Sequence, residues 1–363
     1  MEGLIYLDHL ASTPLDPAVL EAMLPWMRHA GNPHARHRPA WDAADAIEGA
    51  RAEVAALVNA RPGEVVFTSG ATEANNLALL GGVPEVWPVL ASAIEHPSVL
   101  ACLPEPESAR LPVDRRGVVD LDHLEARLRE KPALVSVMAA NNEVGTLQPL
   151  AEIAALCRAH GALFHCDAAQ MPVPMDGIDL LSLSGHKLYG PQGVGALVVR
   201  DGVALRPLLF GGHQQGGRRA GTLPTALCVG LGAACRLARI RREEDAGRIT
   251  ALRERLFTAL ATALPDLRRN SPADGCLPGC LNVTVPGVDA ADLLLDLPDL
   301  ALSTGSACST GAEGPSHVLL ALGLSPEDAH ASFRFGLGRT STESDVDEAA
   351  QRFAQVLTAW RRG

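Results

Sequence analysis

Residues 133–199 read ALVSVMAANNEVGTLQPLAEIAALCRAHGALFHCDAAQMPVPMDGIDLLSLSGHKLYGPQGVGALVV and contain the pattern from which the fold class can be predicted. Short runs of Leu, Val and Ala alternate in it with one longer amphipathic run, Leu150 to His160. The short runs suit strands and the longer run suits a helix. Strands are expected at 133–138, 162–166, 180–184 and 194–199. Their alternation with helical sequence predicts an α/β fold with a mostly parallel sheet flanked by helices.

The same pattern extends in both directions. Upstream, a strand at 64–67 precedes a helix at 71–80, and downstream a helical pattern runs from Thr222 to about Ala261. Its charged middle, residues 239–245, is expected to connect two domains. Beyond it, short strands and helices predict a smaller α+β domain, with elements at 281–285, 290–297, 300–303, 316–322, 332–335 and 343–360. We expect a large domain over 14–245 and a small domain formed by 1–13 and 246–363.

Composition excludes several classes of protein. With 363 residues, 47% hydrophobic and 20% charged, the chain has the composition of a compact globular protein. Its net charge of -11 argues against nucleic acid as the main partner. The N-terminus lacks a cationic signal-peptide region, and the longest apolar run, 220–235, is too short to span a membrane. We therefore expect a cytoplasmic protein without a membrane segment.

The eight cysteines are spread along the chain, which favours reduced thiols over a disulfide framework. Cys276 and Cys280 have a spacing that a metal site can use, but no second pair of Cys or His lies near them in the sequence. Ordinary packing is the better interpretation of this pair, and we expect no metal.

Polar or glycine-rich residues follow each predicted strand. Ligands of parallel sheets bind at the carboxyl ends of the strands. The four segments are therefore expected to converge on one site: Thr68–Glu73, Asn141–Gly145, Asp167–Gln170 and Ser184–Lys187.

Lys187 is the first candidate catalytic residue. It lies in a tight polar turn after a buried strand, where the amine pKa can be depressed and an unprotonated amine can form a Schiff base. The alternative interpretation, which is more common for a lysine after a strand, is a charged side chain exposed to solvent. Asp167 changes this expectation, because it ends the neighbouring strand and its carboxylate needs a cationic partner, which a pyridinium nitrogen supplies. Without Lys187 nearby, Asp167 could be interpreted equally well as the N-cap residue of the next helix.

A candidate phosphate site lies at the start of the predicted helix, where Gly70-Ala71-Thr72 leaves backbone N–H groups free to bind an anion. The hydroxyls of Thr72 and Ser184 and the ring of His186 are further donors. A plain helix cap is the alternative. A lysine, a buried carboxylate and a phosphate cradle together indicate pyridoxal 5'-phosphate (PLP).

Two segments towards the C-terminus complete the candidates. Residues 303–311, STGSACSTG, form a loop of small residues around Cys308, where an accessible thiol can ionise and attack sulfur. Arg334 lies within an apolar strand, and its guanidinium needs an anion. A substrate carboxylate and a structural salt bridge are the two interpretations of Arg334.

In their order along the chain, these segments closely resemble the cysteine desulfurases of the NifS/IscS type, within the class V aminotransferase superfamily of PLP fold type I. The resemblance runs nearly from end to end. The segments that carry it are Tyr6–Pro14, Gly31–Pro33, Phe67–Asn76, Glu95-His96, Asn141–Gly145, Asp167–Gln170, Leu181–Lys187, Gly221-Thr222, Gly305–Cys308, Pro315–His317 and Arg334–Arg339.

The resemblance implies a role for each matching residue. Lys187 would carry PLP and act in catalysis with Cys308, the sulfur acceptor, and with His96, which would stack on the cofactor ring. The other implied cofactor contacts are Ala71, Thr72, Asn142, Asp167 at the pyridine nitrogen, Gln170 at the ring hydroxyl, Ser184, His186 and, from the partner subunit of a homodimer, Thr222. The implied substrate contacts are Asn32, Asn142 and Arg334.

The implied reaction converts L-cysteine to L-alanine and leaves a persulfide on Cys308, from which a protein acceptor takes the sulfur. The sequence does not name that acceptor, and an iron-sulfur scaffold and a sulfur carrier both suit the chemistry. Selenocysteine lyase and an aminotransferase are alternatives on the same fold, and a non-catalytic sulfur-relay scaffold is the alternative from another class. The Cys308 loop favours the desulfurase, because transamination needs no thiol.

Four positions depart from the family's usual pattern. His9 and Leu10 stand in the N-terminal segment where polar residues are common, His213 lies in a loop that lacks the usual Gln-Glu pairing, and Ala220 replaces a common serine. We expect local differences on the substrate side and at the subunit contacts.

Overall fold

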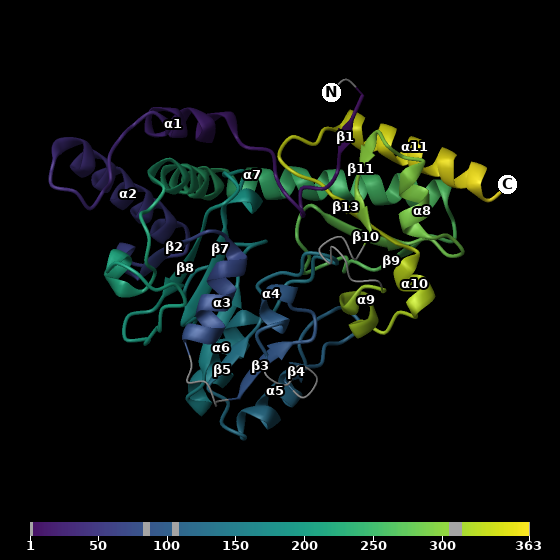
Figure 1. Ribbon diagram of the computed structural model, residues 1–363. Helices are drawn as coiled ribbons and strands as arrows, with labels where there is room; N and C mark the ends of the chain where they lie inside the picture. The colour runs from purple at the N-terminus through teal and green to yellow at the C-terminus, as the bar shows by residue number, and fades with distance from the viewer. Residues whose placement is uncertain (1–2, 83–87, 104–108, 305–313, 363) are drawn as a thin grey trace.

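The computed structural model describes residues 3–82, 88–103, 109–304 and 314–362, and its elements form two groups around one long helix (Figure 1). This helix, α7 (Thr225–Ala263), runs from the group that contains the large sheet to the group that contains the C-terminal helix α11 (Glu343–Trp360). The first half of α7 packs into the core of the large sheet and its second half into the core of the smaller group. The domain limits at residues 14 and 245 remain predictions.

The large sheet has seven strands, and every strand except β8 runs in the same direction. The mostly parallel sheet predicted from the sequence is therefore confirmed. In spatial order the strands are β2 (Val65–Thr68), β8 (Gly195–Val199), β7 (Leu180–Ser184), β6 (Leu163–Asp167), β5 (Leu134–Ser136), β3 (Val89–Ser92) and β4 (Arg110–Leu111).

Both faces of this sheet are buried because side chains alternate along each strand. Val65 and Phe67 belong to one hydrophobic cluster, and Val66 between them belongs to the cluster on the opposite face. The first cluster is covered by α1 (Pro17–Met27), α2 (Arg38–Leu57), α5 (Leu121–Leu128), α6 (Leu150–His160) and α7; the second by α3 (Ala71–Gly81) and α4 (Pro97–Leu100).

The smaller group contains a four-stranded antiparallel sheet and a two-stranded parallel one. The first has the order β12 (Ser303–Thr304), β13 (Ser332–Gly336), β10 (Cys280–Thr284) and β9 (Arg268–Arg269); the second pairs β1 (Ile5–Tyr6) with β11 (Leu300–Ala301). The helices of this group are α8 (Ala290–Leu295), α9 (His317–Ala321), α10 (Pro326–His330) and α11.

One strand predicted from the sequence is divided in two. Residues 300–303 were expected to form a single strand, but β11 and β12 belong to different sheets, with Leu302 between them. The prediction was wrong because a run of apolar residues reports burial and not the sheet that each residue joins.

His9 fills a tight space where the N-terminal segment meets β13. Its ring bonds to the Gly336 carbonyl at 3.0 Å and to the Thr340 hydroxyl at 3.1 Å. A side chain on Gly338 would lie only 2.1 Å from the His9 ring, so glycine is required there. The departure from the family at His9 thus has a structural role, since the ring fixes the N-terminal segment to β13.

Candidate active site

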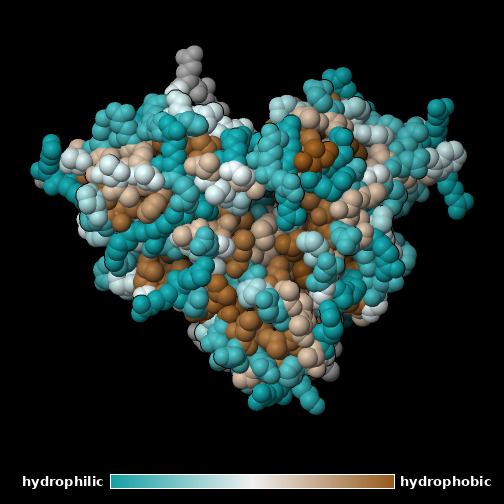
Figure 2. All heavy atoms as spheres, turned by 180° about the vertical axis from the view of Figure 1, so that it is seen from behind, coloured by the Kyte–Doolittle hydropathy of each residue, from teal (hydrophilic) through white to brown (hydrophobic). Residues whose placement is uncertain are grey.

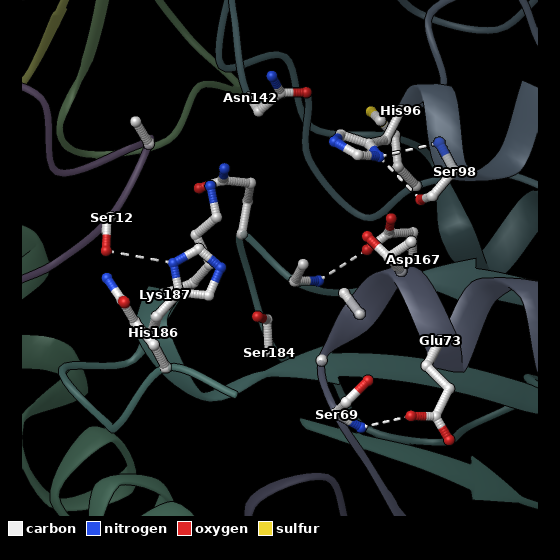
Figure 3. A pocket seen from close by; sticks show the side chains of 18 of the residues that line it. Ser12, Ser69, Glu73, His96, Ser98, Asn142, Asp167, Ser184, His186 and Lys187 are labelled. Carbon is white, nitrogen blue, oxygen red and sulfur yellow. Dashed lines mark hydrogen bonds between the residues drawn. The ribbon is translucent and has the colours of Figure 1, made fainter. Parts of the chain in front are cut away.

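A cavity of about 550 Å³ opens at the carboxyl ends of the parallel strands (Figure 3). Segments from all four predicted loops line it, together with Ala11 and Ser12 of the N-terminal segment. The structure brings together most of the residues that the sequence singled out: Ala71, Thr72, His96, Asn142, Asp167, Gln170, Ser184, His186 and Lys187.

Lys187 ends a single 3₁₀ turn, Gly185–Lys187, that directly follows β7. Its amine donates a hydrogen bond to the Leu10 carbonyl, and the Gln170 amide donates to the same oxygen at 2.9 Å. The backbone at Leu10, another departure from the family, therefore holds two of the predicted cofactor residues. No residue pattern in the sequence indicates a contact with this carbonyl.

Asp167 is the buried carboxylate of the site, only 6% exposed. One oxygen accepts from the Asn75 amide at 2.7 Å and the other from the Ala169 backbone N–H at 3.0 Å. Neither donor is charged, so a cationic ring nitrogen would complement the carboxylate. Asn75 was missed, although an amide between Ala74 and Leu77 on the apolar side of the predicted helix was a sign of a buried polar partner.

Two histidines of the cavity are held in the neutral form. Burial lowers the pKa of His96, which bonds to the Ser98 hydroxyl at 2.8 Å. Burial and the neighbouring Lys187 lower the pKa of His186 to about 4, and its ring bonds to the Ser12 hydroxyl at 3.2 Å. A neutral ring can donate one hydrogen bond and can stack on an aromatic cofactor, which suits the expected roles of both residues.

Helix α3 begins at the wall of the cavity, as predicted, and its first three residues line it. Gly70 precedes the helix with φ +151, in a region that side chains rarely adopt. Behind it, Gly195 of β8 approaches so closely that a methyl group there would lie 2.7 Å from the Gly70 Cα. The Glu73 carboxylate bonds to the Ser69 backbone N–H and pairs with Arg219 at 2.9 Å, which stabilises the first turn.

Glu95 is a fully buried carboxyl group behind His96. It accepts hydrogen bonds from Ser92 and from the Met138 backbone N–H at one oxygen, and its other oxygen has no partner among the described residues. Burial raises its pKa from 4.5 to about 8. The folded protein therefore holds a proton that the unfolded chain releases above pH 4.5. The stability from Glu95 is complete below pH 4.5, falls as the pH rises from 4.5, and is lost at about pH 8.

We expect Glu95→Gln to become more stable than the unaltered protein as the pH increases from 5.5 to 8. The amide keeps the bonds to Ser92 and Met138 without a proton to lose, so the difference in unfolding free energy should grow by up to about 1.4 kcal/mol per pH unit. Denaturant unfolding at several pH values measures it, with Glu21→Gln on the exposed side of α1 as control. If the difference in unfolding free energy between Glu95→Gln and the unaltered protein did not change with pH, Glu95 would not be protonated in the folded protein as inferred.

Arg334 does not line the cavity. Its guanidinium is 0% exposed and pairs with Asp8 at 2.7 Å, and it also donates to the Asn142 carbonyl at 3.1 Å. The structural salt bridge, one of the two interpretations of this arginine, is thus present. The Asn142 carbonyl bond places Arg334 directly behind a residue of the cavity wall.

Besides Arg334, three predicted site residues lie elsewhere or outside the described residues. Asn32 is exposed between α1 and α2, where its side chain accepts from the His34 backbone N–H at 3.1 Å. Thr222 is also exposed and does not line the cavity. Cys308 lies outside the described residues.

Cys276 and Cys280 pack against the Asn141–Gly145 turn. Cys280 donates to the Glu143 carbonyl at 3.4 Å, and burial raises the pKa of both thiols. A methyl group on Gly145 would lie 2.6 Å from the Cys276 sulfur. Within the described part of the chain, no three His, Cys, Asp or Glu residues form a group that could hold a metal ion.

These features suit one kind of cofactor. The cavity joins a lysine amine, a buried carboxylate and a helix N-terminus, which complement an aldehyde, a protonated ring nitrogen and a phosphate group. The residues present therefore fit PLP. They define the site of a PLP-dependent enzyme.

The comparisons with known proteins agree. The class-V aminotransferase family matches residues 5–349, and the chain belongs to this family. Among curated proteins, it is 46% identical to a cysteine desulfurase of Rattus norvegicus, over 96% of this chain and 81% of the relative. The IscS cysteine desulfurase of Rickettsia bellii is 43% identical over 98% of this chain and 92% of its own.

Solved structures give the same result. A NifS-like protein from Rickettsia africae superposes with a TM-score of 0.89 at 31% identity, covering 98% of this chain and 99% of the other. A structure described as SspA in complex with cysteine superposes at 0.80 with 37% identity, covering 93% and 99%. The predicted fold type, family and PLP cofactor are confirmed. No described helix is long and apolar enough to cross a membrane.

Proposed function

We propose that this chain is a cysteine desulfurase that converts L-cysteine to L-alanine and keeps the sulfur as a persulfide on Cys308. The observation that carries this proposal is the position of Lys187 in one cavity with Asp167, His96 and the start of α3. The relatives named cysteine desulfurase, at up to 46% identity over nearly the whole chain, support the same activity.

PLP, when bound, supplies an electron sink for the charge that develops on the substrate Cα. Asp167 would hold the ring nitrogen in its protonated form, and Thr72, Ser184 and His186 would hold the phosphate. The Lys187 amine takes the Cα proton as a general base. Asn142 and, behind it, Arg334 orient the substrate carboxylate. The Cys308 thiolate attacks the substrate sulfur and forms an S–S bond, while the C–S bond breaks with its electron pair left on the carbon, which takes a proton to give alanine.

The test is the stoichiometry of the products. With a reductant, the purified holoenzyme should release alanine and sulfide from L-cysteine in equal amounts over many turnovers. Without a reductant, we expect a burst of about one alanine per subunit, because the persulfide then blocks Cys308. A keto acid product would indicate an aminotransferase, and turnover of selenocysteine alone would indicate a selenocysteine lyase.

We also propose a homodimer whose active sites lie at the subunit interface. Thr222 is exposed and does not line the cavity of its own subunit, as expected if the partner subunit's Thr222 completes the phosphate site. Large apolar side chains are exposed outside the cavity, including Met27 at 63%, Trp41 at 58% and Phe210 at 87%, and apolar patches are also visible on the rear face (Figure 2). A dimer interface would bury such side chains.

The place of action and the acceptor are part of the same proposal. We place the enzyme in the cytoplasm and propose a protein as the sulfur acceptor, either an iron-sulfur scaffold or a sulfur carrier. Transfer of labelled sulfur from L-cysteine to proteins of a cell extract would identify it.

A further inference from the structure

The carboxylate of Asp8 covers the buried guanidinium of Arg334. The Arg334 side chain has no exposed surface, whereas that of Asp8 is 22% exposed. One oxygen of Asp8 accepts both the Arg334 bond at 2.7 Å and a bond from the Ser303 hydroxyl at 2.8 Å. A ligand that approaches this pair from solvent therefore meets the carboxylate first.

The backbone keeps Asp8 in this place. Asp8 bridges to Gly336 in the ladder with β13, the strand that carries Arg334. On either side, His9 donates to the Gly336 carbonyl at 3.1 Å and Gly336 donates to the Leu7 carbonyl at 2.6 Å. These bonds hold the backbone of Asp8 beside β13, and the bonds from Arg334 and Ser303 hold its carboxylate, so a ligand meets the negative charge beside the guanidinium.

We propose that Asp8 is a specificity-determining residue that prevents the site from binding carboxylates that lack an amino group. The inference rests on the proposed function, in which Arg334 binds the substrate carboxylate. The carboxylate of a ligand meets the positive charge of Arg334 and the negative charge of Asp8 together. The carboxylate alone therefore contributes little binding free energy. An amino acid binds because its amino group is also engaged, while Arg334 only orients its carboxylate.

Two analogues of L-cysteine separate these contributions. 3-Mercaptopropionate has the thiol and carboxylate without the amine, and cysteamine has the thiol and amine without the carboxylate. In the holoenzyme of Asp8→Asn, 3-mercaptopropionate should inhibit cysteine turnover with an inhibition constant about tenfold lower, equal to about 1.4 kcal/mol. The dissociation constant of cysteamine, followed by the cofactor absorbance, should not change. The asparagine oxygen can still accept both bonds, so only the charge is removed.

Ser303→Ala is the matched control, since it removes a neutral bond to Asp8 and leaves the charge pair. This variant should leave the inhibition constant of 3-mercaptopropionate and the dissociation constant of cysteamine unchanged. Weaker 3-mercaptopropionate binding in Asp8→Asn would overturn the proposal, because Asp8 would then serve to orient Arg334. An equal change in the binding constants of both analogues in Asp8→Asn would also overturn the proposal.

The unaltered holoenzyme gives a second measurement that does not depend on the folding of the variant. Here 3-mercaptopropionate should bind no more tightly than 2-mercaptoethanol, which has the thiol with neither a carboxylate nor an amine, and clearly tighter binding of 3-mercaptopropionate would overturn the proposal. Failure of the unaltered protein to turn over L-cysteine would count against the proposed function instead. In that case the same constants are measured as ligand binding by calorimetry, so the role of Asp8 is still tested.

Discussion

Replacing Lys187 with alanine should reduce the release of alanine and sulfide from L-cysteine by at least about 10³-fold. The amine is expected both to attach the cofactor and to take the Cα proton, so no other group of the described cavity replaces it. The absorbance of the lysine-bound cofactor should disappear as well. Steady-state kinetics and the absorbance spectrum of the purified variant measure the two losses.

The chain offers a matched control for this variant, because Lys131 and Lys187 are its only lysines. Lys131 is exposed in the turn after α5. Lys131→Ala should keep full activity, and borohydride reduction of the holoenzyme should fix the cofactor to the peptide that contains Lys187. Cofactor on the Lys131 peptide would contradict the assignment of the site.

Replacing Cys308 with alanine should leave the cofactor spectrum intact and reduce sulfide release by at least about 10³-fold. The residues that hold the cofactor are all retained, but the substrate sulfur then has no thiolate to attack it. We expect the variant to bind L-cysteine and change the cofactor absorbance without releasing alanine. Rapid mixing with L-cysteine followed by quantification of alanine measures this.

Cys276→Ala is the control for a general effect of thiol loss. Cys276 is partly exposed, and it packs against Gly145 outside the lining of the active-site cavity. This variant should retain its activity. Undiminished turnover in Cys308→Ala would exclude the persulfide step, and the reaction would then resemble a lyase that needs no protein thiol.

Local sequence patterns predicted the elements that position the site. The helix expected at 150–160 and the strand expected at 180–184 have those bounds in the structure, and α11 begins and ends as expected. Periodicity succeeds there because each element buries a face whose apolar spacing is visible in the sequence. The convergence of four loops followed from the direction of the strands alone.

Contacts between distant segments were not predictable in this way. The Leu10 carbonyl bonds to Lys187 and Gln170, Asp8 pairs with Arg334, and Asn75 bonds to Asp167 across 92 positions of the sequence. No local pattern reports which backbone oxygen or amide will face a given side chain. These partners are chosen when the N-terminal segment, α3 and β13 pack together.

The family, the cofactor and the lysine that is expected to carry it could be inferred without a structure, because they depend on residue types, on spacing within loops and on the order of the motifs along the chain. The pairing of Arg334 with Asp8, whose carboxylate covers the guanidinium, depends on how distant segments pack. A buried charge takes its partner from whichever segment the fold brings within hydrogen-bond distance, and here that segment lies 326 positions away along the chain.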